Sequence, residues 1–220
     1  MHSSDPADQF AAQHLGGRTM PNDLRKLLNL QWRNAASSGA NPLNDRGVTF
    51  LDGNRLPVLI ETVRTGQDTL KGIPRLADSQ AMADMIRYCG FVAEDADGNA
   101  IGYWFGPDRI PIEAAPLICF AKNGNFSILR GNRIAEALLV IASHENDRVF
   151  ADLRDYLNEQ GLAITARTIH DVQQPECSQP PQATYQQLIQ AYSADLSTTS
   201  APDTGSPVNI MTTHRGPKIG

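Results

Sequence analysis

Residues 115–143, APLICFAKNGNFSILRGNRIAEALLVIAS, constrain the fold more than any other part of this chain. Two short apolar runs flank Asn123-Gly124, a dipeptide that favours a two-residue turn between antiparallel strands. Such a loop would pair Ala121 with Phe126 and Cys119 with Ile128 on one face, and Phe120 with Ser127 and Ile118 with Leu129 on the other. Because both strands are apolar on both faces, the sequence predicts a sheet that is covered on both sides.

A second hairpin is predicted over residues 91–106, where Asp97-Gly98 favours the same kind of turn. A two-residue loop there would pair Asp95 with Ala100, Ala93 with Gly102 and Phe91 with Trp104 on one side. On the other side it would pair Glu94 with Ile101 and Val92 with Tyr103. Residues 48–51 are predicted to form a further strand, whereas the pattern of residues 58–63 fits a strand or a helix. Apolar residues at helical spacing predict four helices, within residues 21–34, 78–90, 132–142 and 147–162.

The chain has 220 residues, which suits a single domain with tails. We expect residues 1–20 to form a flexible segment or a weak helix, and residues 21–167 to form the domain. Residues 168–214 contain no Lys or Arg and are rich in Gln, Pro, Ser and Thr. This composition predicts a largely disordered polar tail over 168–220, with one helix at 183–195.

Charge and cysteine content limit the partners and the compartment. The formal net charge is -5, and the chain shows no basic patch of the kind that nucleic-acid binding requires. No window approaches the roughly 18 apolar residues of a membrane-spanning helix, and the N-terminus does not resemble a secretory signal. The three cysteines are widely spaced, which fits a reducing compartment. We therefore expect a cytoplasmic protein that binds neither nucleic acid nor membrane.

No motif for a common enzyme class is present. The sequence lacks a P-loop, a GxGxxG stretch and a GxSxG elbow, and no His has another His or a Cys three or four residues later. We expect no metal, no cofactor and no enzymatic activity. An alternative is a hydrolase with an unrecognised site, built from polar residues near predicted strand and helix ends: Glu94, Asp95, Asp108 and His144.

Two features are candidates for binding a protein partner. Three carboxylates cluster at the predicted hairpin of residues 91–106, where they form either a solvated turn or a contact surface. The aromatic run at 103–105 forms either core or an interface anchor, because Tyr and Trp are enriched at interfaces. The candidate partner-binding residues are Glu94, Asp95, Asp97, Tyr103, Trp104, Phe105 and Asp108.

Residues 90–160 resemble the C-terminal half of the SUKH superfamily, which includes bacterial toxin-immunity proteins and yeast cell-wall regulators. The resemblance lies in a strand, turn, strand and helix pattern at Ala115–Phe120, Phe126–Ile128 and Arg133–Ala142. It implies an α+β fold with a bent, mostly antiparallel sheet and helices packed around it. It also implies a non-enzymatic protein that binds and neutralises a protein toxin, and a mildly acidic binder suits a basic target. The alternative is a secreted effector or adaptor that uses its polar ends for export or docking.

Overall fold

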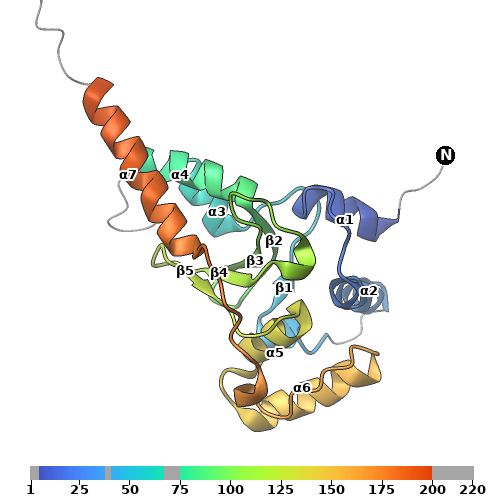
Figure 1. The fold of residues 1–220 in the computed structure, drawn as a ribbon. Helices are drawn as coiled ribbons and strands as arrows, with labels where there is room; N and C mark the ends of the chain where they lie inside the picture. Colours follow the sequence, from blue (N-terminus) through green and yellow to red (C-terminus); the bar gives the residue numbers. More distant parts are fainter. Residues whose placement is uncertain (1–4, 38–40, 67–74, 200–220) are drawn as a thin grey trace, which may run out of the picture.

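The middle of the chain folds into a five-stranded antiparallel sheet, in which each strand pairs with the next along the chain, in a computed structural model of the protein (Figure 1). The structure describes residues 5–37, 41–66 and 75–199. Helices cover both faces of the sheet, so the expected α+β fold is confirmed. The strands are β1 (Thr49–Phe50), β2 (Cys89–Glu94), β3 (Ala100–Trp104), β4 (Leu117–Phe120) and β5 (Phe126–Ile128).

The buried side chains form two hydrophobic clusters, one on each face of the sheet. One face is covered by α1 (Pro6–His14), α2 (Asn22–Ser37), α5 (Ile134–Ser143) and α6 (Asp147–Glu159). The other face is covered by α3 (Val58–Arg64), α4 (Arg75–Tyr88) and α7 (Pro181–Thr199). Three short 3-10 turns, η1 (Asn44–Arg46), η2 (Ile112–Ala114) and η3 (Ile169–Asp171), lie in the connections.

The predicted helices are present, with shifted ends. The segment that fitted a strand or a helix is α3, and α4 begins at Arg75, three residues before the expected start at Asp78. Helix α6 ends as its sequence indicates, because Gly161 adopts a left-handed conformation with φ 83° and the following Leu162 is buried. Helix α5 is apolar around most of its circumference, since it lies between the sheet and α6.

Both hairpins close with three-residue loops, so the expected two-residue registers are wrong. Glu94 faces Ala100 and Phe120 faces Phe126, one residue away from the expected pairing in each case. Only Gly98 and Gly124 have positive φ in the two loops, whereas the expected turn type requires it at both central positions. A bulge between Phe91 and Ala93 shifts the register of the β2–β3 hairpin by one further residue.

The domain extends beyond residues 21–167 at both ends. Helix α1 belongs to the core, because Ala7 and Phe10 are buried against α2 and the sheet. After α6, residues 162–180 cross the molecule as an extended segment, here called the strap, and lead into α7. Ile169 in the strap and Tyr185 in α7 are buried, so the expected boundary at 167 is corrected. Residues 200–220 lie outside the described residues.

Candidate functional site

The aromatic run at 103–105 is core and offers no exposed ring for a partner. Tyr103, Trp104 and Phe105 are 3%, 1% and 1% exposed. Trp104 donates its indole N–H to the Gln179 carbonyl at 2.8 Å, and the guanidinium of Arg18 lies 3.8 Å from the centre of the Phe105 ring. The interface alternative for these three residues is therefore corrected, since both faces of β3 are covered by helices.

Glu94, another candidate, is a buried structural residue. Its Oε1 accepts a hydrogen bond from the Val58 N–H at 2.7 Å, at the first residue of α3. Its Oε2 pairs with Arg55. The first N–H groups of a helix have no acceptor within the helix and need one from elsewhere. A carboxylate at this position also interacts favourably with the helix dipole. Glu94 thus joins β2 to α3 and is not available to a partner.

The remaining predicted residues do not converge. Asp95 accepts hydrogen bonds from the backbone N–H groups of Asp97 and Asn99 at 3.0 and 2.9 Å, which fixes the hairpin loop. Asp97 is exposed at the tip of that loop, and Asp108 accepts a hydrogen bond from Gln179. His144 occupies the left-handed position that ends α5. Glu94, Asp95, Asp108 and His144, the residues of the hydrolase alternative, line none of the three hollows described below.

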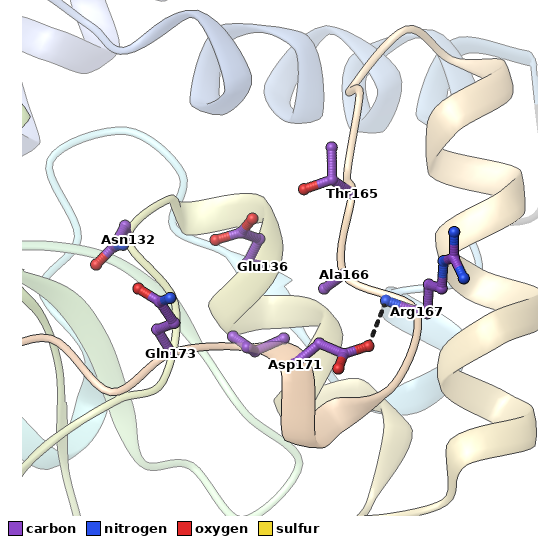
Figure 2. Close-up of a pocket in the computed structure, with 8 residues that line it drawn as sticks. Asn132, Glu136, Thr165, Ala166, Arg167, Asp171 and Gln173 are labelled. Carbon is purple, nitrogen blue, oxygen red and sulfur yellow. Dashed lines mark hydrogen bonds between the residues drawn. The ribbon is translucent and has the colours of Figure 1, made fainter.

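Two adjoining hollows, of about 410 and 480 Å³, form a continuous concave surface among the described residues. They share Asn132 and Gln173, and together we call them the acidic groove. One hollow lies between the strap and the start of α5 (Figure 2). The other lies between the strap and η2. Sequence reasoning did not find this surface, because it brings together segments that are up to 63 residues apart, from Glu113 to Glu176.

Hydrogen bonds from folded neighbours hold the strap in place along the groove. The Gly131 N–H donates to the Gln173 carbonyl at 2.8 Å, which fastens the strap to the loop before α5. Gly131 has φ 106°, and a Cβ there would lie 2.9 Å from the Ala137 nitrogen, so only glycine fits. Further along, the Asn158 side chain bonds both backbone groups of Ile164. The groove is therefore formed by the fold and does not need a ligand to assemble it.

Carboxylates dominate the charge of the acidic groove. It is lined by four carboxylates, Glu113, Glu136, Asp171 and Glu176, and by one cation, Arg167. Figure 2 shows the Arg167 side chain directed away from Glu136 and Gln173.

Asp171 is the carboxylate of the groove whose position is most firmly fixed. It accepts hydrogen bonds from the N–H groups of Thr168 and Arg167, both at 2.9 Å. These bonds lower the pKa of Asp171 and keep it ionised at neutral pH. The groove is thus suited to hold cationic groups, with the amides of Asn132 and Gln173 available to hydrogen-bond a peptide backbone.

Part of this surface had a signal in the sequence. The absence of Lys and Arg from 168 to 214 leaves Arg167 as the last cation of the chain before the carboxylates of Asp171 and Glu176. That stretch was interpreted as a disordered tail, whereas its first part lines the groove. Glu113 and Glu136 carry no comparable sequence signal, because their role depends on how the strap is placed.

The described part of the chain contains no group of three or more His, Cys, Asp or Glu side chains placed to hold a metal ion. Within the same ranges, no helix is long and apolar enough to cross a membrane. Comparison with known proteins found no matching protein-family model, no matching curated protein and no matching solved structure. The resemblance to SUKH domains stays a prediction from the sequence pattern.

Proposed function

We propose that this chain is a non-enzymatic protein-binding domain that holds a basic segment of a protein partner in the acidic groove. The observation that carries the proposal is the charge of the groove, four carboxylates against one arginine, whose side chain is directed away from Glu136 and Gln173 in Figure 2. The residues that line the two hollows come from three segments of the chain: η2, the start of α5 and the strap. An extended segment with Lys or Arg side chains matches this arrangement better than a compact apolar ligand does.

Electrostatic complementarity gives the groove its selectivity. Opposite potentials on two surfaces accelerate their encounter and disfavour partners of the wrong charge, and these effects weaken as salt screens the charges. Glu113 and Glu176 are exposed and free to reorient toward a cation, whereas Asp171 is fixed by backbone N–H groups. The net charge of -5 acts in the same direction at longer range.

The sequence resemblance directs the choice of partner. Immunity proteins of the SUKH type are thought to act by binding a toxin tightly, so the first candidate is a basic protein toxin encoded beside the gene for this chain. Under this proposal, the domain neutralises the toxin by occupying its surface, without chemistry of its own.

The decisive experiment is capture of a partner by tagged protein, combined with charge reversal in the groove. The unaltered chain should retain one stoichiometric basic protein from its native lysate, identified by mass spectrometry. The double variant Glu113→Lys/Glu176→Lys should bind the purified partner at least about tenfold more weakly, which corresponds to about 1.4 kcal/mol. Raising NaCl from 50 to 300 mM should weaken the unaltered complex as well.

The matched control reverses two exposed carboxylates on α6, Asp152→Lys and Glu159→Lys, which lie outside the groove. This variant has the same net charge as the groove variant, so it separates local contact from long-range attraction. Equal loss in both variants would refute the groove as the binding surface. Failure of the tagged chain to retain any protein would contradict the protein-binding part of the proposal. Failure of the chain to relieve the toxicity of the neighbouring gene product on co-expression would contradict the immunity part.

A further inference from the structure

A third hollow, of about 200 Å³, lies where the end of α1 meets the end of α4 and the start of β2. It shares no lining residue with the acidic groove. Its composition is also different: apolar side chains and two arginines line it, and none of the described residues that line it is a carboxylate. The residues that matter for the argument are Leu56, Ile86, Cys89, Phe91, Arg18 and Arg87.

The walls of this hollow are held rigidly. Helix α1 ends in two left-handed glycines, and the Gly17 N–H donates to the Ala11 carbonyl at 3.1 Å. The end of α1 lies so close to β2 that a Cβ on Gly90 would be 2.9 Å from the His14 carbonyl oxygen. His14 itself is only 7% exposed, lines the wall, and hydrogen-bonds the Gly53 carbonyl at 2.7 Å. The hollow is therefore preformed, which reduces the entropy cost of binding.

The two arginines supply positive charge to one small space. Arg18 donates through Nη1 to the Leu15 carbonyl at 3.1 Å and stacks on Phe105. Arg87 pairs through Nη1 with Asp84 at 3.1 Å, and its side chain is 71% exposed. A guanidinium has five N–H donors in a planar fork, so a single bond through Nη1 leaves donors that suit a carboxylate. The Leu15 backbone carbonyl and the Phe105 ring thus hold the Arg18 guanidinium at the hollow, while the exposed Arg87 side chain can move toward a ligand.

We infer that this hollow binds a small amphipathic monocarboxylate, with the anionic group between Arg18 and Arg87 and the apolar body against Leu56, Ile86 and Phe91. The volume sets the size of the ligand, because a dry cavity of about 150 Å³ in a protein takes up benzene. A ring acid of the size of benzoate therefore fits a hollow of about 200 Å³. The inference is independent of the acidic groove, which has the opposite charge.

Titration of the ¹⁵N-labelled protein with benzoate tests the inference directly. We expect saturable shifts of backbone amide signals at Gly16, Ile86 and Phe91, and no comparable shifts with benzamide, which has the same shape without the charge. Arg87→Gln should weaken benzoate binding about tenfold, the loss expected for a charge-assisted hydrogen bond. Arg64→Gln is the matched control, since Arg64 forms the same i,i+3 ion pair on α3 but lines no part of the hollow.

Cys89 provides a second readout inside the hollow. In a Cys119→Ser/Cys177→Ser background it is the one remaining thiol of the three in the chain. Benzoate should slow its reaction with methyl methanethiosulfonate, and benzamide should not. Absence of saturable shifts, equal binding of benzamide, or unchanged affinity in Arg87→Gln would each overturn the inference. Equal affinity for inorganic phosphate would overturn the apolar part of it.

Discussion

At the scale of single residues, Glu94 shows that two contacts of one carboxylate can differ in their contribution to stability. The Glu94 side chain, which accepts the bond from the Val58 N–H, is 12% exposed, whereas the side chain of Arg55, its partner in the ion pair, is 56% exposed. Glu94→Ala should lower the free energy of unfolding by about 2 kcal/mol or more, because the N–H at the start of α3 loses a charged acceptor. Arg55→Ala should lower it by less than about 1 kcal/mol, as for exposed ion pairs. Urea denaturation of both variants measures the difference, and equal losses would contradict the assignment of Glu94 as a helix cap.

Asp78 on α4 is a residue that destabilises the fold at neutral pH. It is 3% exposed, its Oδ2 has no hydrogen-bond partner among the described residues, and burial raises its pKa to about 6. Because the folded-state pKa lies above the ordinary value of 3.8, the folded chain binds this proton more tightly than the unfolded chain. The carboxyl group therefore costs no stability below about pH 4 and costs progressively more as the pH rises through 6.

Asp78→Asn should consequently raise the free energy of unfolding at pH 7.5, by about 1–3 kcal/mol, and give no gain at pH 4. Urea denaturation at the two pH values checks this. Asp97→Asn, which alters an exposed carboxylate at a loop tip, serves as the control and should show no such pH-dependent gain. A gain in Asp78→Asn that is equal at both pH values would show that ionisation is not the cause.

At the scale of elements, the free edge of β5 is covered by side chains and not by another strand. The Phe126 N–H donates to Gln182 Oε1 at 2.6 Å, and Gln174 Nε2 donates to the Ile128 carbonyl at 2.9 Å. An uncovered edge can pair with other chains, and proteins commonly block such edges. The strap and α7 thus supply amide groups that occupy the hydrogen-bonding positions of a sixth strand.

Gln182→Ala should therefore increase the hydrogen-exchange rate of the Phe126 amide at least tenfold and lower the free energy of unfolding by about 1 kcal/mol. NMR-detected exchange of this amide measures the first effect. Gln186→Ala, at an exposed position of the same helix, should change neither. The double variant Gln174→Ala/Gln182→Ala should self-associate in size-exclusion chromatography, and a monomer with unchanged exchange would rule out the blocking role.

The order of the elements and the type of most of them could be predicted from the sequence, but the type of α3, the course of the strap and the strand registers could not. Periodic apolar residues indicate α2, α5 and α6, because each of these helices buries one face or most of its surface. That burial is visible in the spacing of apolar residues within the segment itself. The register of the β2–β3 hairpin depends instead on Asp95, whose side chain accepts hydrogen bonds from the loop N–H groups and favours a three-residue loop. The dipeptide Asp97-Gly98 is compatible with either loop length, so it does not decide between them.

At the scale of the whole molecule, the hydrophobic cluster between the sheet and the helices α3, α4 and α7 depends on α7. This helix belongs to the part of the chain whose composition predicted a largely disordered tail. The ring of Tyr185 lies 6.1 Å from that of Phe120 and 5.3 Å from that of Phe126, and it closes the hydrophobic cluster on that face. A few apolar residues among many Gln and Ser cannot show from sequence alone which surface they cover. For the same reason the acidic groove was not predicted, since it exists only where the strap crosses α5 and η2.

A chain ending at residue 180 tests whether α7 is part of the domain, with a chain ending at 199 as its reference. Loss of α7 uncovers the aromatic rings of β4 and β5, so the shorter chain should lose about 3 kcal/mol or more of unfolding free energy and bind a hydrophobic dye. Tyr185→Ala in the full chain should cost about 3–5 kcal/mol. Tyr185→Phe should be nearly neutral, because the buried hydroxyl has no partner among the described residues. Equal urea midpoints for the two truncated chains would place the domain boundary before α7, and α7 would then be an appendage whose tyrosine contributes nothing to the core.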